Sequence, residues 1–305
     1  NNKYSLTEGL GLKKFNQIIN NVFKKLPDLE EWFPKEVSKI FNHASWKESI
    51  LKLHNEDINI IRNTKYFKRL VFDEIFANFL LSSKIRSKIK KIKKKNKVFN
   101  SNYQDRILKN FKFKLTKDQI YALENINKDM KSKQKMFRLL QGDVGSGKTI
   151  VSIIAALNAV KSGYQVSIMA PTEILATQHY NFILENFNKY CTAELLTSKI
   201  EYTKRKKILS ELSNNKINIL IGTHSLFQSK LSYFNLGLII IDEQHKFGVS
   251  QRKKLSDKGG NNCDVLVMSA TPIPRTMMMT VYGDMDISLI KTKPKNRKSI
   301  KTYSK

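Results

Sequence analysis

The chain has 305 residues, of which 41% are hydrophobic and 27% charged, which is typical of a folded protein and excludes disorder throughout. At roughly 150 residues per domain this length predicts about two domains. No stretch approaches the roughly 18 apolar residues of a membrane span, and the start of the chain lacks the apolar core of a signal peptide. The 55 Lys and Arg against 26 Asp and Glu give a net charge of +29, which predicts a polyanionic partner, most simply nucleic acid, although an AT-rich genome explains part of the Lys excess.

Residues 1–100 are predicted to be helical, because they lack the alternation of apolar and polar residues that is typical of strands. From Phe67 to Phe79 the apolar positions recur every three or four residues, which predicts an amphipathic helix. The helix is predicted to continue over Lys84–Lys97, a stretch with many basic residues and no acid. Two interpretations stay open for this stretch: it lies along phosphates, or it is a solvated face that ends in a flexible tail.

From about Phe113 short apolar runs alternate with helical patterns. The predicted strands are near-continuous hydrophobic runs, as expected for strands buried on both faces: Phe137–Gln141, Val166–Ala170, Ile217–Gly222, Leu238–Ile241 and Val265–Ser269. The predicted helices between them are Lys148–Lys161, Glu173–Asn188 and Tyr202–Leu212. This alternation predicts an α/β fold with a doubly wound, mostly parallel sheet, whose ligands bind beyond the carboxyl ends of the strands.

A phosphate-binding loop follows the first predicted strand. Its eight residues fit the pattern G-x-x-x-x-G-K-[ST]: Gly142, Asp143, Val144, Gly145, Ser146, Gly147, Lys148 and Thr149. The glycines allow backbone N–H groups to turn toward phosphates, and the helix that follows adds the positive end of its dipole. Lys148 is predicted to reach the β- and γ-phosphates of ATP, and the Thr149 hydroxyl to ligate Mg²⁺.

Two acids, Asp242 and Glu243, end another buried apolar run. Buried carboxylates are costly unless they have partners or chemistry to perform. Asp242 is predicted to hold Mg²⁺ through water, and Glu243 to polarise the water that attacks the phosphate. The pair therefore indicates hydrolysis of the nucleotide, with a simple Asp-Glu helix cap as the alternative.

These motifs resemble those of superfamily-2 helicases and, among them, the RecG family of bacterial ATP-dependent DNA helicases that remodel branched DNA. The resemblance is carried by RLLQGDVGSGKT at 138–149, MAPTEILATQH at 169–179, IGTHSLFQ at 221–228, LGLIIIDEQHKFGVSQR at 236–252 and MSATPIPRTMMMTVYGDMDIS at 268–288. Upstream, FKLTKDQ at 113–119 is similar to the adenine-binding Q-motif. Residues 4–10 are similar to the segment that follows the family's wedge domain, and residues 68–81 to the family's helical linker.

The resemblance implies roles for further residues. Gln119 is expected to bind the adenine edge, with an ordinary exposed helical glutamine as the alternative. The DNA backbone is expected to contact Thr172, Glu173, Gly222, Thr223 and His224, although the first two also fit a helix N-cap. Four residues are expected to couple the nucleotide state to the grip on DNA: His245, Ser269, Ala270 and Thr271. His179 is expected to pack rather than to take part in chemistry, and Arg275 is given no role.

The resemblance also implies the domain organisation. Residues 1–100 are expected to form a helical linker after a wedge domain, residues 101–290 the ATP-binding RecA-like lobe, and residues 291–305 the start of the connection to a second RecA-like lobe. Because the chain begins at Asn1 and ends at Lys305, it is expected to be part of a longer protein. That protein is expected to be bacterial, cytoplasmic and associated with the nucleoid. Cys191 and Cys263 are expected to be reduced. The alternatives are the translocase module of a transcription-repair coupling factor and a basic DNA-binding module with an inert ATP site; a protein translocase or RNA helicase fits the motifs less well.

Overall fold

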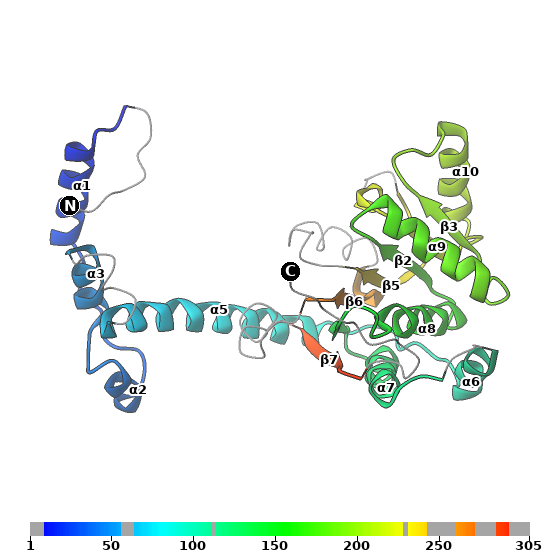
Figure 1. Cartoon of the computed structure of the whole chain (residues 1–305), viewed down its shortest axis with the longest axis horizontal. Helices are drawn as coiled ribbons and strands as arrows, with labels where there is room; N and C mark the ends of the chain where they lie inside the picture. The colour runs from blue at the N-terminus through cyan, green and yellow to red at the C-terminus, as the bar shows by residue number, and fades with distance from the viewer. Residues whose placement is uncertain are drawn as a thin grey trace, which may run out of the picture. The chain divides into compact units, whose positions relative to one another are not determined.

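The computed structural model describes residues 9–55, 64–110, 114–227, 231–242, 260–271 and 285–292. Its contacts divide the chain into two compact units, Asn1–Leu81 and Ser82–Lys305, which are described separately (Figure 1). Among the described residues, no helix combines the length and the apolar character that crossing a membrane requires.

The first unit is helical, as predicted. Its described helices are α1 (Leu12–Lys24), α2 (Lys35–Ile40), α3 (Trp46–Asn55) and the first part of α5 (Lys65–Lys91). Trp32, Phe33 and Phe72 pack against one another with ring centroids 5.0–6.0 Å apart, which fixes the chain before α2 against α5. Arg69 is buried, with its guanidinium group over the Phe33 ring, and pairs with Asp73 and Glu31.

The described residues of the second unit form a seven-stranded sheet in the order β3-β4-β2-β5-β6-β1-β7. Every strand pairing within it is parallel, so the predicted doubly wound fold is confirmed. The strands are β1 (Phe137–Gly142), β2 (Gln165–Met169), β3 (Ala193–Leu196), β4 (Ile219–Gly222), β5 (Leu236–Ile241), β6 (Asp264–Ser269) and β7 (Asp286–Ile290).

Helices cover both faces of this sheet. They are α6 (Ser101–Asn110), α7 (Lys117–Lys131), α8 (Lys148–Lys161), α9 (Glu173–Phe187) and α10 (Tyr202–Ser213), with 3₁₀ turns η1 (His224–Phe227) and η3 (Gly260–Asn262). On one face, α7, α8 and α9 share a hydrophobic core with the strands, and α8 lies nearly wholly buried within it (Figure 1). On the other face, Ile208 and Leu212 of α10 pack with η1 and the alternate side chains of the same strands.

Five of the seven strands were predicted from their hydrophobic runs, and two were not. The unpredicted strands, β3 and β7, form the two edges of the sheet. Each has side chains that are only partly buried, so neither is a continuous apolar run. An edge strand contacts one neighbour instead of two, and its sequence is therefore less constrained.

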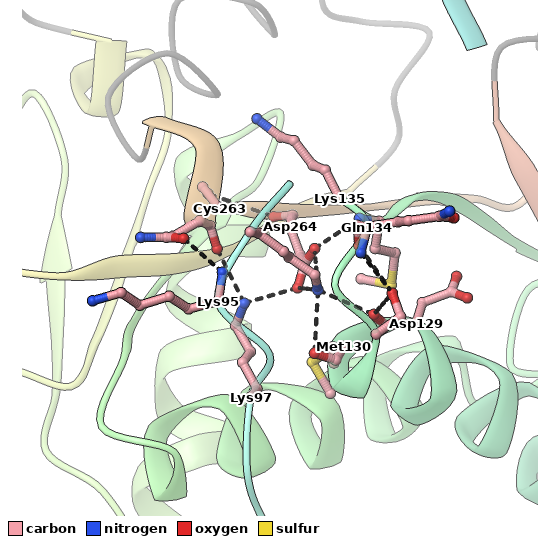
Figure 2. A network of polar contacts seen from close by, with 12 residues as sticks. Lys95, Lys97, Asp129, Met130, Gln134, Lys135, Cys263 and Asp264 are labelled. Carbon is pink, nitrogen blue, oxygen red and sulfur yellow. Dashed lines mark hydrogen bonds and ion pairs between the residues drawn. The ribbon is translucent and has the colours of Figure 1, made fainter. Parts of the chain in front are cut away.

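The predicted helix over Lys84–Lys97 is wrong after Lys91, because α5 ends at that residue. Beyond this point the chain crosses the amino-terminal edge of the sheet, where Lys94 and Lys97 are buried. Both ammonium groups bind the carboxylate of Asp264, with Nζ–O distances of 2.6–2.8 Å (Figure 2). Neither the phosphate-facing nor the solvated interpretation holds for these two lysines.

Additional hydrogen bonds complete this buried cluster, which we call the Asp264 cluster: Lys94, Lys97, Asp264 and the backbone groups that they bind. Lys94 also donates to the carbonyl oxygens of Asp129 and Met130 at the end of α7, at 3.0 and 3.2 Å. The Met136 amide donates to Asp264 at 2.8 Å. Burial lowers the pKa of Lys94, against the attraction of Asp264, which raises it. The cluster therefore fixes the segment after α5 to the starts of β1 and β6.

Both cysteines are buried free thiols. Burial raises the pKa of each to about 12, so each thiol stays protonated at neutral pH. A buried, protonated thiol behaves as a small apolar side chain, in agreement with the prediction that both cysteines are reduced.

Candidate nucleotide site at the carboxyl edge of the sheet

The predicted phosphate loop connects the end of β1 to the start of α8. Gly145 and Gly147 have φ angles of 74° and 87°, a left-handed conformation that favours glycine. A side chain at Gly147 would overlap the amide nitrogen of Gln119. The sequence of the loop is therefore dictated by its backbone, and its turn brings the amino terminus of α8 to the carboxyl edge of the sheet.

The loop fits a polyphosphate. The Lys148 ammonium donates to the carbonyl oxygens of Gly142 and Asp143, at 2.6 and 3.1 Å, so a positive charge is held across the loop. The Ser146 hydroxyl is buried and has no hydrogen-bond partner among the described residues. A buried polar atom without a partner is unfavourable, and a bound ligand with acceptor oxygens can satisfy it.

Asp242 lies directly after β5, at the same edge of the sheet as the loop. Its amide donates to the Met169 carbonyl at 2.8 Å, and its side chain is largely buried. The Nε2 atom of His179, in α9, lies 2.9 Å from Oδ2 of Asp242. Because a carboxylate only accepts hydrogen bonds, His179 donates and fixes the orientation of the carboxylate. The expectation that His179 only packs missed this contact, which joins residues 63 positions apart.

Gln119 is buried, which excludes an exposed helical glutamine. With Thr116 it forms a capping box at the start of α7, in which the Gln119 side chain accepts from the Thr116 amide at 2.8 Å. Its Nε2 donates to the Ser146 carbonyl of the phosphate loop at 2.7 Å. The residue that the Q-motif resemblance singles out is therefore in direct contact with the phosphate loop.

Ser269 and Thr271, at the end of β6, bond to each other and to β1. Their hydroxyl oxygens are 2.9 Å apart, and the Thr271 amide donates to the Ser269 hydroxyl at 3.3 Å. Gln141 donates to the Thr271 carbonyl at 2.9 Å, from the position directly before the phosphate loop. Gln141 was not expected at the site, although a glutamine within a buried apolar strand indicates a hydrogen bond to a neighbour.

The residues expected to contact DNA lie at the ends of β2 and β4 and at the start of α9. Thr172 is the N-cap of α9 and accepts from the Leu175 amide at 3.3 Å. The Glu173 carboxylate accepts from the Ser198 hydroxyl at 2.6 Å, and this bond lowers the pKa of Glu173. Gly222 ends β4, and Thr223 beside it is buried. A groove next to these residues is lined by Glu173, Ile174, Thr177, Gln178, Asn181, Thr197 and Lys199.

Glu243, His245 and Arg275 lie outside the described residues, as does the side chain of His224. Ala270 is described and follows the last residue of β6.

The chain is similar to curated helicases and to their solved structures. It is 42% identical to the ATP-dependent DNA helicase RecG of Aquifex aeolicus over 89% of this chain and 35% of that protein. It is 39% identical to the RecG of Bacillus subtilis over 98% of this chain and 44% of that protein. The structure of RecG bound to a three-way DNA junction matches 97% of this chain and 40% of that one, with 36% identity and a TM-score of 0.72.

The resemblance to RecG drawn from the motifs is thus confirmed, and the chain spans less than half the length of these relatives. The DEAD-box helicase Mss116, bound to ssRNA, shares the fold at 18% identity, with a TM-score of 0.50 over 63% of this chain. Residues 116–280, more than half of the chain, match the model of the DEAD/DEAH box helicase family. The chain therefore belongs to the DEAD/DEAH box helicase family.

Proposed function

We propose that the chain is the ATP-binding part of a RecG-type DNA helicase, which couples ATP hydrolysis to the remodelling of branched DNA in repair and recombination. The observation that carries this proposal is the phosphate loop at the same sheet edge as Asp242, in a chain similar to junction-bound RecG along 97% of its length. In this proposal residues 1–100 are the helical linker, residues 101–290 the first RecA-like lobe, and residues 291–305 the start of the connection to a second lobe. A wedge domain and the second lobe belong to the longer protein, which acts on DNA in the bacterial cytoplasm, at the nucleoid.

The phosphate loop, Gly142–Thr149, holds the phosphates of ATP in this proposal, with Lys148 at the β- and γ-phosphates. Thr149 and Asp242 hold Mg²⁺, which when bound neutralises phosphate charge. Glu243 orients the attacking water. The Gln119 amide carries a second N–H and a second lone pair beyond its bonds to Ser146 and Thr116, and these suit the adenine edge.

The DNA contacts of this proposal are made to the backbone by Thr172, Gly222, Thr223 and His224. Glu173 has a different role, because its carboxylate is bound to Ser198 and its charge repels phosphate. It holds the loop after β3 beside the DNA. Four residues couple the nucleotide state to these DNA contacts: His245, Ser269, Ala270 and Thr271. Gln141, in the strand before the phosphate loop, binds the carbonyl of Thr271.

The proposal is tested by measuring Mg-ATP binding and steady-state ATP hydrolysis by the 305-residue chain, with and without a three-way DNA junction. We expect binding with almost no turnover, because the resemblance to superfamily-2 helicases implies a site that closes between two lobes, with arginine fingers from the second lobe. DNA-stimulated turnover by this chain alone would contradict a half-site that needs a second lobe. Absence of nucleotide binding would contradict the proposed function altogether and favour a basic DNA-binding module. Burial of Lys94 and Lys97 already removes two of the charges on which that alternative relied.

His179 is predicted to act through Asp242. His179→Ala removes the hydrogen bond that orients the carboxylate, and loss of such a support weakens metal affinity by about tenfold or more. We therefore expect the Mg²⁺ concentration at half-maximal binding of a fluorescent ATP analogue to rise about tenfold. His179→Gln, which keeps a donor, is expected to recover part of the loss. Gln178→Ala, at the exposed neighbouring position of α9, is the control, and an unchanged Mg²⁺ dependence in His179→Ala would refute the role.

A further inference from the structure

The first turn of α7 holds the segment that follows β7. Oδ2 of Asp118 accepts hydrogen bonds from the backbone amides of Lys291 and Thr292, at 2.9 and 2.8 Å. The hydroxyl groups of Thr292 and Thr116 lie 3.0 Å apart. Both amides lower the pKa of Asp118, and the Thr292 amide lowers it more than the Lys291 amide does. Acids are common in the first turn of a helix because of the helix dipole, but the dipole alone requires no bond to residues 173 and 174 positions away.

The same helical turn contacts the phosphate loop. Gln119, the next residue, donates to the Ser146 carbonyl, and the capping box fixes its side chain to Thr116. Asp118 and Gln119 are adjacent residues of one helix, so neither backbone can move far without the other. The turn thus has one side chain on the phosphate loop and one on residues 291–292.

The sheet joins the same two segments. β7 is parallel to β1, with Ile290 paired with Gly142, the first residue of the phosphate loop. Lys291 and Thr292 follow directly, and are held by β1 through the preceding residue and by α7 through Asp118. Residues 290–292 and the phosphate loop therefore share two independent connections, one through the sheet and one through α7.

We propose that Asp118 is a positioning residue, which transmits the occupancy of the phosphate loop to the segment that leaves the lobe after β7. This inference rests on the proposed function, because it requires ATP in the loop and a second lobe beyond residue 292. A nucleotide that draws Gln119 toward adenine shifts the first turn of α7, and the Asp118 carboxylate carries Lys291 and Thr292 with it. Asp118 acts in this inference through the two backbone amides that its carboxylate binds.

The experiment measures amide hydrogen exchange at Lys291 and Thr292 by NMR in the 305-residue chain. Without nucleotide, Asp118→Ala is expected to speed exchange of both amides about tenfold, as for loss of a charged acceptor. Asp118→Asn keeps an acceptor oxygen and is expected to speed it much less. Asp105→Ala, which removes an exposed acid from α6, is the matched control and should leave both amides unchanged. Unchanged exchange in Asp118→Ala would overturn the inference.

A saturating Mg-ATP analogue tests the transmission itself. We expect it to change exchange at Lys291 and Thr292 by about threefold or more in the unmodified chain. The change should be clearly smaller in Asp118→Ala, which should still bind the analogue but keeps only the connection through the sheet. An equal response in both chains, or no response in a chain that binds the analogue, would overturn the inference and leave the proposed function standing. Failure of the unmodified chain to bind the analogue would overturn the proposed function, and the transmission with it.

Discussion

Replacing Lys148 by alanine is expected to weaken Mg-ATP binding by about 100-fold, because two charge-assisted hydrogen bonds to phosphate contribute about 3 kcal/mol together. The geometry of the loop supports this size of effect. Lys148 is largely buried, and its ammonium is already held across the loop by the Gly142 and Asp143 carbonyls. Little side-chain entropy remains to be lost when phosphate binds. Isothermal titration calorimetry with a slowly hydrolysed ATP analogue measures the effect directly.

Two further variants separate the position of the charge from its presence. Lys204→Ala removes an exposed lysine from α10 and changes the net charge equally, so its affinity should stay within about twofold of the unmodified chain. Lys148→Arg keeps the charge but replaces a compact ammonium by a broad planar group, and should still bind poorly. Equal affinity for Lys148→Ala and the unmodified chain, with both folded by circular dichroism, would show that the loop does not bind the nucleotide.

The largest expected effect on stability is at the Asp264 cluster. Asp264→Asn leaves two buried ammonium groups facing a neutral amide, and breaking a buried ion pair by removal of one partner costs about 3–5 kcal/mol. The asparagine oxygen can still accept from the Met136 amide, so the loss reports the charges rather than that bond. Urea unfolding followed by circular dichroism measures the change in the free energy of unfolding.

A triple variant tests whether the buried charges cause the loss. Asp264→Asn combined with Lys94→Met and Lys97→Met removes all three charges and fills similar volume with flexible apolar side chains. We expect it to recover at least about half of the free energy lost in Asp264→Asn. Asp105→Asn, at an exposed position, should change stability by less than about 0.5 kcal/mol. A triple variant no more stable than Asp264→Asn would rule out uncompensated charge as the cause.

The fold was predictable where burial leaves a continuous pattern in the sequence. Buried parallel strands such as β5 are apolar throughout, so they were found without any knowledge of their partners. The stretch after Lys91 was not predictable in the same way, because lysines are almost never fully buried unless paired. Asp264, the partner of Lys94 and Lys97, is 170 and 167 positions away, and no local signal pairs it with them.

The candidate site was predictable where a motif fixes both backbone and chemistry. The phosphate loop needs its glycines for left-handed φ angles and its lysine for charge, and both requirements are visible in consecutive residues. The contacts of His179 with Asp242 and of Asp118 with Lys291 were not visible, because each depends on how two distant elements meet. Single polar residues on helices have many uses, and only the folded chain selects one of them.

The placement of the Asp264 cluster has a mechanical consequence. Asp264 and Asp286 begin β6 and β7, and they bind the chain through Lys94 and Lys97 and through Arg86 and Lys90. A force on this part of the chain is therefore passed first to the starts of two strands. A load along the strands is shared by all hydrogen bonds between neighbouring strands, whereas a pull across the sheet would open these hydrogen bonds one at a time. The far ends of the two strands are Ser269 and Ile290, which lie beside the phosphate loop. A force on the starts of β6 and β7 therefore reaches the phosphate loop through the strands.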